Sequence, residues 1–126
     1  MSLRTPLGQA RGLGSAKDGT EHWWLQRVTA VALVPLVLVL LYYMIRLLGA
    51  DHAHVVASLG HPVAAGFLVL LFIAAFLHLK LGLQVVIEDY VHGAASKLTL
   101  LLANTFGCWI LALIGILAVL KLAFGG

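Results

Sequence analysis

Several residues that could do chemistry follow one another along one apolar segment, FLHLKLGLQVVIEDYVHG, residues 76–93. His78 carries an imidazole that can bind iron or move a proton, and Asp89 and Tyr90 add a carboxylate and a phenol. At 100° per residue, Asp89 projects from nearly the same helical face as His78, about 16 Å further along the axis. Gly82 lies on that face too, where a missing side chain admits a flat group or another helix. The spacing predicts two separate sites on one helix.

Three apolar segments must position these residues. The chain has 126 residues, of which 62% are hydrophobic and 10% are charged, so a bilayer is expected as its solvent. Each segment is long enough to cross hydrocarbon about 30 Å thick, which takes about 20 helical residues. Because the loops between them are short, we expect an all-α membrane protein with three transmembrane helices running up-down-up. The expected ranges are a segment at 1–21 and a membrane-anchor domain at 22–124, with helices at about 24–48, 62–88 and 97–122.

The basic residues indicate how the chain crosses the membrane. Four of the eight precede the first apolar run, namely Arg4, Arg11, Lys17 and Arg27. The positive-inside rule therefore puts the N-terminus in the cytoplasm or the mitochondrial matrix. A bacterial inner membrane with a cytoplasmic N-terminus is the expected location, ahead of the mitochondrial inner membrane. Since these charges are dispersed and form no patch, membrane lipid is an expected partner and nucleic acid is not.

His78 lies near the middle of its predicted span, where an ionised side chain is costly and a neutral imidazole still needs a partner. It could donate a hydrogen bond to a neighbouring helix, or it could be an axial ligand of a haem iron. Because the other histidines all lie at helix ends or in loops, a bis-histidine haem would have to be shared with another subunit.

Two further polar residues interrupt the apolar segments. Lys80 lies about 200° around the helix from His78 and nearly as deep, so it needs a polar partner or must snorkel to the surface. Asn104, in the third segment, is expected to form an interhelical hydrogen bond.

A group of polar residues is expected at the cytoplasmic boundary. The topology brings Asp89, Tyr90 and His92 to the same membrane face as His22 and Arg27. A phenol can donate to a carbonyl, a carboxylate can relay a proton, and arginine can hold an anion. Together they suit reduction of an amphipathic quinone, although each residue also fits an ordinary interfacial role.

Two motifs carry a family resemblance. One is H-x3-G-x6-D-Y, formed by His78, Gly82, Asp89 and Tyr90, and the other is R-x-T-A in the approach GTEHWWLQRVTA, formed by Arg27, Thr29 and Ala30. From about residue 14 to its end, the chain resembles the smaller of the two hydrophobic membrane-anchor subunits of succinate dehydrogenase (complex II).

The resemblance implies a haem b shared within a larger helical bundle that the chain forms with the larger membrane-anchor subunit. His78 would be one axial ligand of the haem iron, and the larger anchor subunit would supply the other. Arg27 would contact a haem propionate or the edge of the quinone pocket, and Gly82 would give the haem clearance. His22 departs from the pattern, since it precedes Arg27 by five residues and some members have a histidine six residues before the arginine.

The resemblance also implies a quinone site and soluble partners. Tyr90 would donate a hydrogen bond to a ubiquinone carbonyl, with Asp89 supporting the site. Succinate would be oxidised at FAD in a flavoprotein subunit, and electrons would pass through the clusters of an iron-sulfur subunit to ubiquinone. The chain alone is not expected to be catalytic, and the enzymatic activity would be that of the assembled complex.

Two other functions are compatible with the residues. The chain could anchor a fumarate reductase that runs the reverse reaction with menaquinone. Alternatively, it could be a small non-redox transporter or assembly protein, in which His78 and Lys80 line a proton or substrate path.

Overall fold

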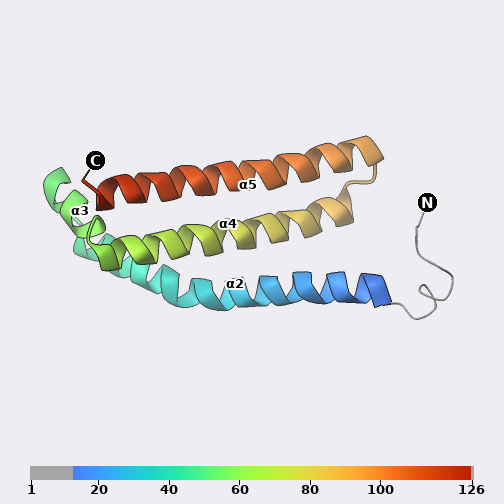
Figure 1. Cartoon of the computed structure of the whole chain (residues 1–126), viewed down its shortest axis with the longest axis horizontal. Coiled ribbons are helices and arrows are strands. Elements are labelled where there is room, and N and C mark those ends of the chain that lie inside the picture. Colours follow the sequence, from blue (N-terminus) through green and yellow to red (C-terminus); the bar gives the residue numbers. More distant parts are fainter. Residues whose placement is uncertain (1–12, 126) are drawn as a thin grey trace.

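The structure is a computed structural model that describes residues 13–125, with side chains from Thr20 onward. It contains helices α2 (Leu13–Arg46), α3 (His52–Leu59), α4 (Pro62–Tyr90) and α5 (Ala94–Ala123). Helices α2, α4 and α5 are each long and apolar enough to cross a membrane, and they alternate in direction (Figure 1). The prediction of an all-α membrane protein with three spans is therefore confirmed.

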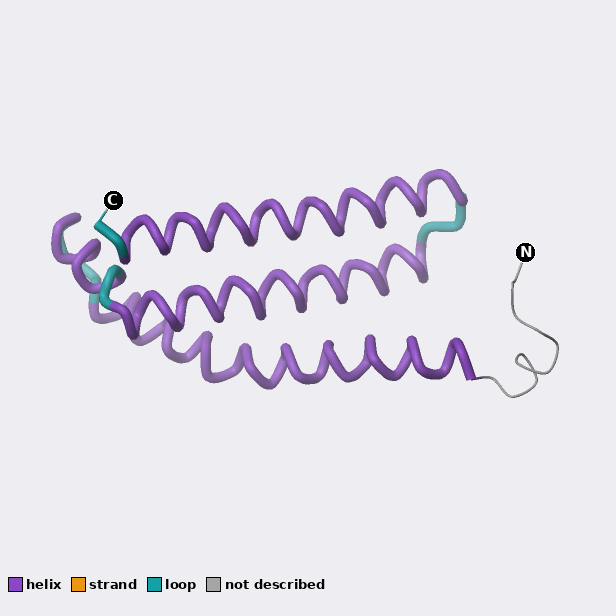
Figure 2. The backbone as a smooth tube through the Cα atoms, viewed as in Figure 1, coloured by secondary structure: helices purple, strands orange, loops and turns teal. Residues whose placement is uncertain are grey.

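Helix α4 lies between the other two long helices. It packs against α2 on one side and α5 on the other, whereas α2 and α5 do not contact each other within residues 13–125. Figures 1 and 2 show the same arrangement, with α4 in the middle. Few side chains are buried, and large apolar residues are exposed along all three helices, so these surfaces are left to lipid or to partner helices.

Helix α2 is longer than the sequence predicts. It begins at Leu13 rather than near residue 24, and it contains Pro35. Proline has no N–H and its ring crowds the preceding turn, so the helix is weakened there. Figure 2 shows α2 bending in its second half while its first half runs beside α4. Arg4 and Arg11, two of the basic residues that indicate orientation, lie outside the described residues.

The first connection holds a short helix, α3, that the sequence interpretation missed. Asp51 caps it, because its Oδ1 accepts the backbone N–H of His54 at 2.9 Å. At Gly60, where α3 ends, a Cβ would lie 2.6 Å from the carbonyl oxygen of Leu122. Only glycine therefore fits where this connection crosses the end of α5.

The α4–α5 interface combines one close approach with one polar contact. A Cβ at Gly115 would lie 2.5 Å from the Phe72 ring, so that ring packs on the backbone of α5. Asn104 donates from Nδ2 to the carbonyl oxygen of Lys80 at 2.9 Å, and it accepts a long contact from the Cys108 thiol at 3.4 Å. The interhelical bond expected of Asn104 is confirmed.

Candidate functional site

A polar stripe on α2 faces α4. His22, Gln26 and Thr29 are spaced i, i+4, i+7, which puts them on one side of a helix. Thr29 contacts His78 across the interface, and a Cβ at Gly82 would lie 3.7 Å from Nε2 of Gln26. The antiparallel register therefore sets the α2 stripe against the His78 face of α4.

The contact between Thr29 and His78 is direct. Oγ1 of Thr29 lies 3.0 Å from Nδ1 of His78, and only 5% of the Thr29 surface is exposed. The same oxygen lies 2.8 Å from the carbonyl oxygen of Leu25 and 3.1 Å from that of Gln26. Thr29 thus has three polar neighbours, two of which can only accept hydrogen bonds.

This geometry assigns the hydrogens. A hydroxyl has one hydrogen to donate, and without a hydrogen between them two oxygens 2.8 Å apart would repel each other. The Thr29 hydrogen therefore points to the carbonyl of Leu25, as helical threonines commonly do. Its lone pair is left to accept the N–H of Nδ1 on His78. The imidazole then carries its proton on Nδ1, and Nε2 keeps a free lone pair.

A cavity of about 350 Å³ adjoins this contact. Its lining residues come from α2 and α4 and are His22, Trp23, Gln26, Arg27, Ala30, His78 and Val85. Nε2 of His22 is buried without a hydrogen-bond partner in the structure. The Arg27 guanidinium lies 5.7 Å from the centre of the Trp23 ring, within the range of a cation–π interaction.

The structure therefore brings together three of the residues singled out from the sequence, His22, Arg27 and His78. One side of the cavity offers an imidazole with an available lone pair. Another offers a cation and a buried nitrogen that still needs a partner. The imidazole lone pair can bind a metal, and the cation can pair with an anionic substituent. Together they suit a flat metal-bearing group with carboxylate side chains, such as a haem with its propionates. Gly82 lies one turn beyond His78, against α2, and does not itself line the cavity.

Asp89 and Tyr90 lie apart from this cavity. They form the last turn of α4, where both are exposed, and 77% of the Tyr90 surface is open. Helix α4 ends at Tyr90, so His92 lies in the connection to α5 and not on α4. His78 and the pair of Asp89 and Tyr90 thus lie at different positions along the same helix.

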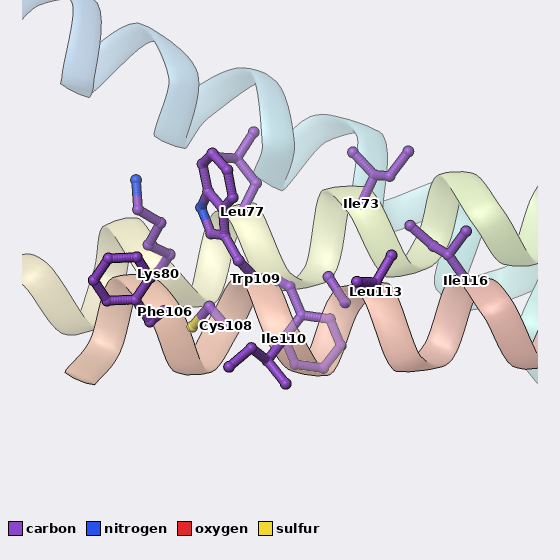
Figure 3. A pocket seen from close by; sticks show the side chains of 11 residues that line it. Ile73, Leu77, Lys80, Phe106, Cys108, Trp109, Ile110, Leu113 and Ile116 are labelled. Atoms are coloured by element: carbon purple, nitrogen blue, oxygen red, sulfur yellow. The ribbon is translucent and has the colours of Figure 1, made fainter. Parts of the chain in front are cut away.

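Lys80 faces the opposite side of α4. It lines a larger, almost wholly apolar groove of about 580 Å³ between α4 and α5. Figure 3 shows Lys80 and Phe106 at one end of this groove and Ile116 at the other. The groove has no further charged residue in its lining. His78 and Lys80, two positions apart, therefore serve different interfaces.

Sequence reasoning missed Gln26 and named Thr29 only as a motif position. The signal that could have found them was the spacing of His22, Gln26 and Thr29, a polar stripe at helical period inside an otherwise apolar approach. What could not be seen from sequence was the register that sets this stripe against His78.

A family model described as succinate dehydrogenase/fumarate reductase transmembrane subunit matches residues 1–112. The chain belongs to this family. The succinate dehydrogenase hydrophobic membrane anchor subunit of Paracoccus denitrificans is 31% identical over 99% of this chain and 96% of its own length. The subunit of the same name from Rickettsia bellii is 38% identical over 80% of this chain and 81% of its own length. No solved structure matches the chain significantly.

Membership of the succinate dehydrogenase/fumarate reductase family confirms the resemblance carried by the two motifs. The chain is a membrane-anchor subunit of an oxidoreductase complex, which implies partner subunits. Three apolar helices of membrane-spanning length agree with this role.

Proposed function

We propose that this chain anchors a succinate:ubiquinone oxidoreductase, supplies one axial ligand of a haem b and forms part of the ubiquinone-reduction site. The observation that carries the haem assignment is the environment of the His78 side chain. Its Nδ1 is engaged by Thr29 at 3.0 Å, and its ring lines a cavity shared with His22 and Arg27. His22 also lines this cavity and lies inside α2 rather than at a helix end as the sequence suggested, but it precedes Thr29 by seven residues, about two turns from the level of His78. The second axial ligand would therefore come from the larger membrane-anchor subunit.

The chain's own residues would hold the haem in the following way. Nε2 of His78 supplies the nitrogen ligand, and Arg27 pairs with a propionate. The unpartnered Nε2 of His22 can accept or donate a hydrogen bond at the same edge. Gly82 keeps α2 and α4 close beyond the ligand. The haem, when bound, provides a one-electron carrier within the membrane.

The ubiquinone site is assigned to the end of α4. Tyr90 is exposed there, and its hydroxyl can donate to a quinone carbonyl while Asp89 supports proton transfer. An iron-sulfur subunit docked on this face would deliver the electrons, and a flavoprotein subunit with FAD would oxidise succinate. The N-terminus then lies on the cytoplasmic side of a bacterial inner membrane, in line with its basic residues.

The haem assignment is tested by replacing His78 in the assembled complex. His78→Ala should abolish the b-type signal in a reduced-minus-oxidised spectrum, because the iron loses a ligand. Lys80→Ala is the matched control, since it changes the same helix two residues away on the face toward α5. Retention of haem in His78→Ala, or equal loss in both variants, would remove His78 from the ligand set.

The quinone assignment has its own test. Tyr90→Phe should lower quinone reductase activity while succinate oxidation with an artificial dye persists, because the flavin lies in another subunit. Tyr42→Phe, at an exposed tyrosine toward the opposite end of α2, should leave both activities unchanged. An equal loss of both activities in Tyr90→Phe would contradict the assignment. Preference for menaquinone in the intact complex would support the fumarate reductase alternative.

A further inference from the structure

We propose that Thr29 is a positioning residue that fixes the tautomer and the ring orientation of His78. This inference rests on the proposed role of His78 as a haem ligand. A ring nitrogen binds iron only when it carries no proton, and the proton must then sit on the other nitrogen. The structure provides one partner for that proton, Oγ1 of Thr29 at 3.0 Å.

Hydrogen bonds within α2 leave the Thr29 hydroxyl able only to accept a hydrogen bond from the His78 ring. Its only hydrogen is held by the helix carbonyls at 2.8 and 3.1 Å, so the hydroxyl has none left to give to Nδ1. The opposite tautomer would put an unprotonated Nδ1 against an oxygen lone pair. That arrangement is repulsive, and burial of Thr29 removes water that could relieve it. The free lone pair is thereby kept on Nε2.

The contact also connects two helices. Thr29 lies on α2 and His78 on α4, and the remainder of the ring adjoins the cavity. A hydrogen bond at Nδ1 removes free rotation of the imidazole and increases the electron density on Nε2. Loss of this bond should therefore weaken haem binding and raise the reduction potential of the haem, because ferric iron loses a more basic ligand.

The test compares haem binding and haem midpoint potential in the purified complex. Thr29→Val replaces the hydroxyl by a methyl of similar size and should weaken haem retention by about 10- to 100-fold, with a higher midpoint potential. Thr29→Ser restores the oxygen and should return both values toward those of the unchanged complex. If Thr29→Val does not assemble, Thr29→Ala removes the hydroxyl without placing a methyl against the ring.

Thr99 offers a matched control. Its Oγ1 donates to the carbonyl oxygen of Ala95 at 2.8 Å, the same local bond that Thr29 makes, but Thr99 is exposed and its hydroxyl does not hydrogen-bond a histidine of the described residues. Thr99→Val should leave haem retention and potential unchanged. An unchanged potential in Thr29→Val, or a serine variant as impaired as the valine one, overturns the proposal. Retention of haem in His78→Ala would instead overturn the ligand assignment, and this inference with it.

Discussion

The two faces of α4 differ in what they contribute. The face toward α2 carries His78 and meets a hydroxyl, an amide and a second imidazole around a cavity of about 350 Å³. The face toward α5 packs Phe72 on Gly115 and borders a larger groove that is apolar except for Lys80. One helix thus presents a polar surface suited to a cofactor and an apolar surface suited to helix packing.

This difference shows why His78 and Lys80 need separate explanations. Two positions along a helix turn the side chain by about 200°, so His78 and Lys80 meet different neighbours despite similar depth. The His78 side chain is matched by a polar partner on α2. The Lys80 backbone carbonyl accepts a hydrogen bond from Asn104, whereas its side chain lines the apolar groove. We therefore expect changes on the α2 face to alter binding of the proposed haem, and changes on the α5 face to alter stability.

Of the substitutions that change packing on the two faces of α4, Gly82→Leu is expected to have the largest effect. A Cβ at this position would lie 3.7 Å from Gln26, so the longer leucine side chain would push against α2 beside His78. Overpacking costs about 1–3 kcal/mol, and about 1.4 kcal/mol corresponds to a tenfold loss of haem affinity. Haem content per complex, measured by the pyridine haemochrome spectrum, should fall accordingly.

Gly66→Leu is the control for this substitution, because a Cβ at Gly66 has no atom within 4 Å and the residue belongs to the same helix. Normal haem content in Gly82→Leu would show that the α2 face tolerates bulk, and the contrast between the two faces would fail.

A smaller effect is expected from Gly115→Ala on the other face. The added Cβ would lie 2.5 Å from the Phe72 ring, and displacing that ring by one carbon should destabilise the complex by about 1 kcal/mol relative to an unobstructed glycine-to-alanine change in the same helix. Thermal unfolding of the solubilised complex measures this loss. The haem spectrum per folded complex should not change.

Gly107→Ala provides the comparison, since a Cβ there meets no atom within 4 Å. Both substitutions gain the same helix propensity, about 1 kcal/mol, so the difference between them isolates the contact with Phe72. Equal unfolding temperatures for the two variants would mean that the close approach of α4 and α5 at Gly115 does not contribute to stability.

The smallest effect is expected from Asn104→Ala. This change removes the hydrogen bond to the Lys80 carbonyl, and such interhelical bonds contribute about 0.6 kcal/mol on average in membranes. A slight fall in unfolding temperature with normal haem content is the expected result. Haem loss in Asn104→Ala would show that the two faces of α4 are coupled.

The sequence was sufficient for the features that depend on one helix at a time. Apolar length predicted the three spans, and helical spacing put His78 and Lys80 on different faces. Helix α3 was missed because a capped helix of eight residues has too few turns to show a period. The role of Thr29 was missed for another reason. A contact between residues 29 and 78 depends on how α2 and α4 are aligned, which no local pattern encodes.

The cavity beside His78 is built by two of the three spans alone. Every residue that lines it lies before residue 90 and comes from α2 or α4, so α5 contributes no part of its wall. The site is therefore a property of a helical hairpin, and the third span could be exchanged without removing any wall of the cavity.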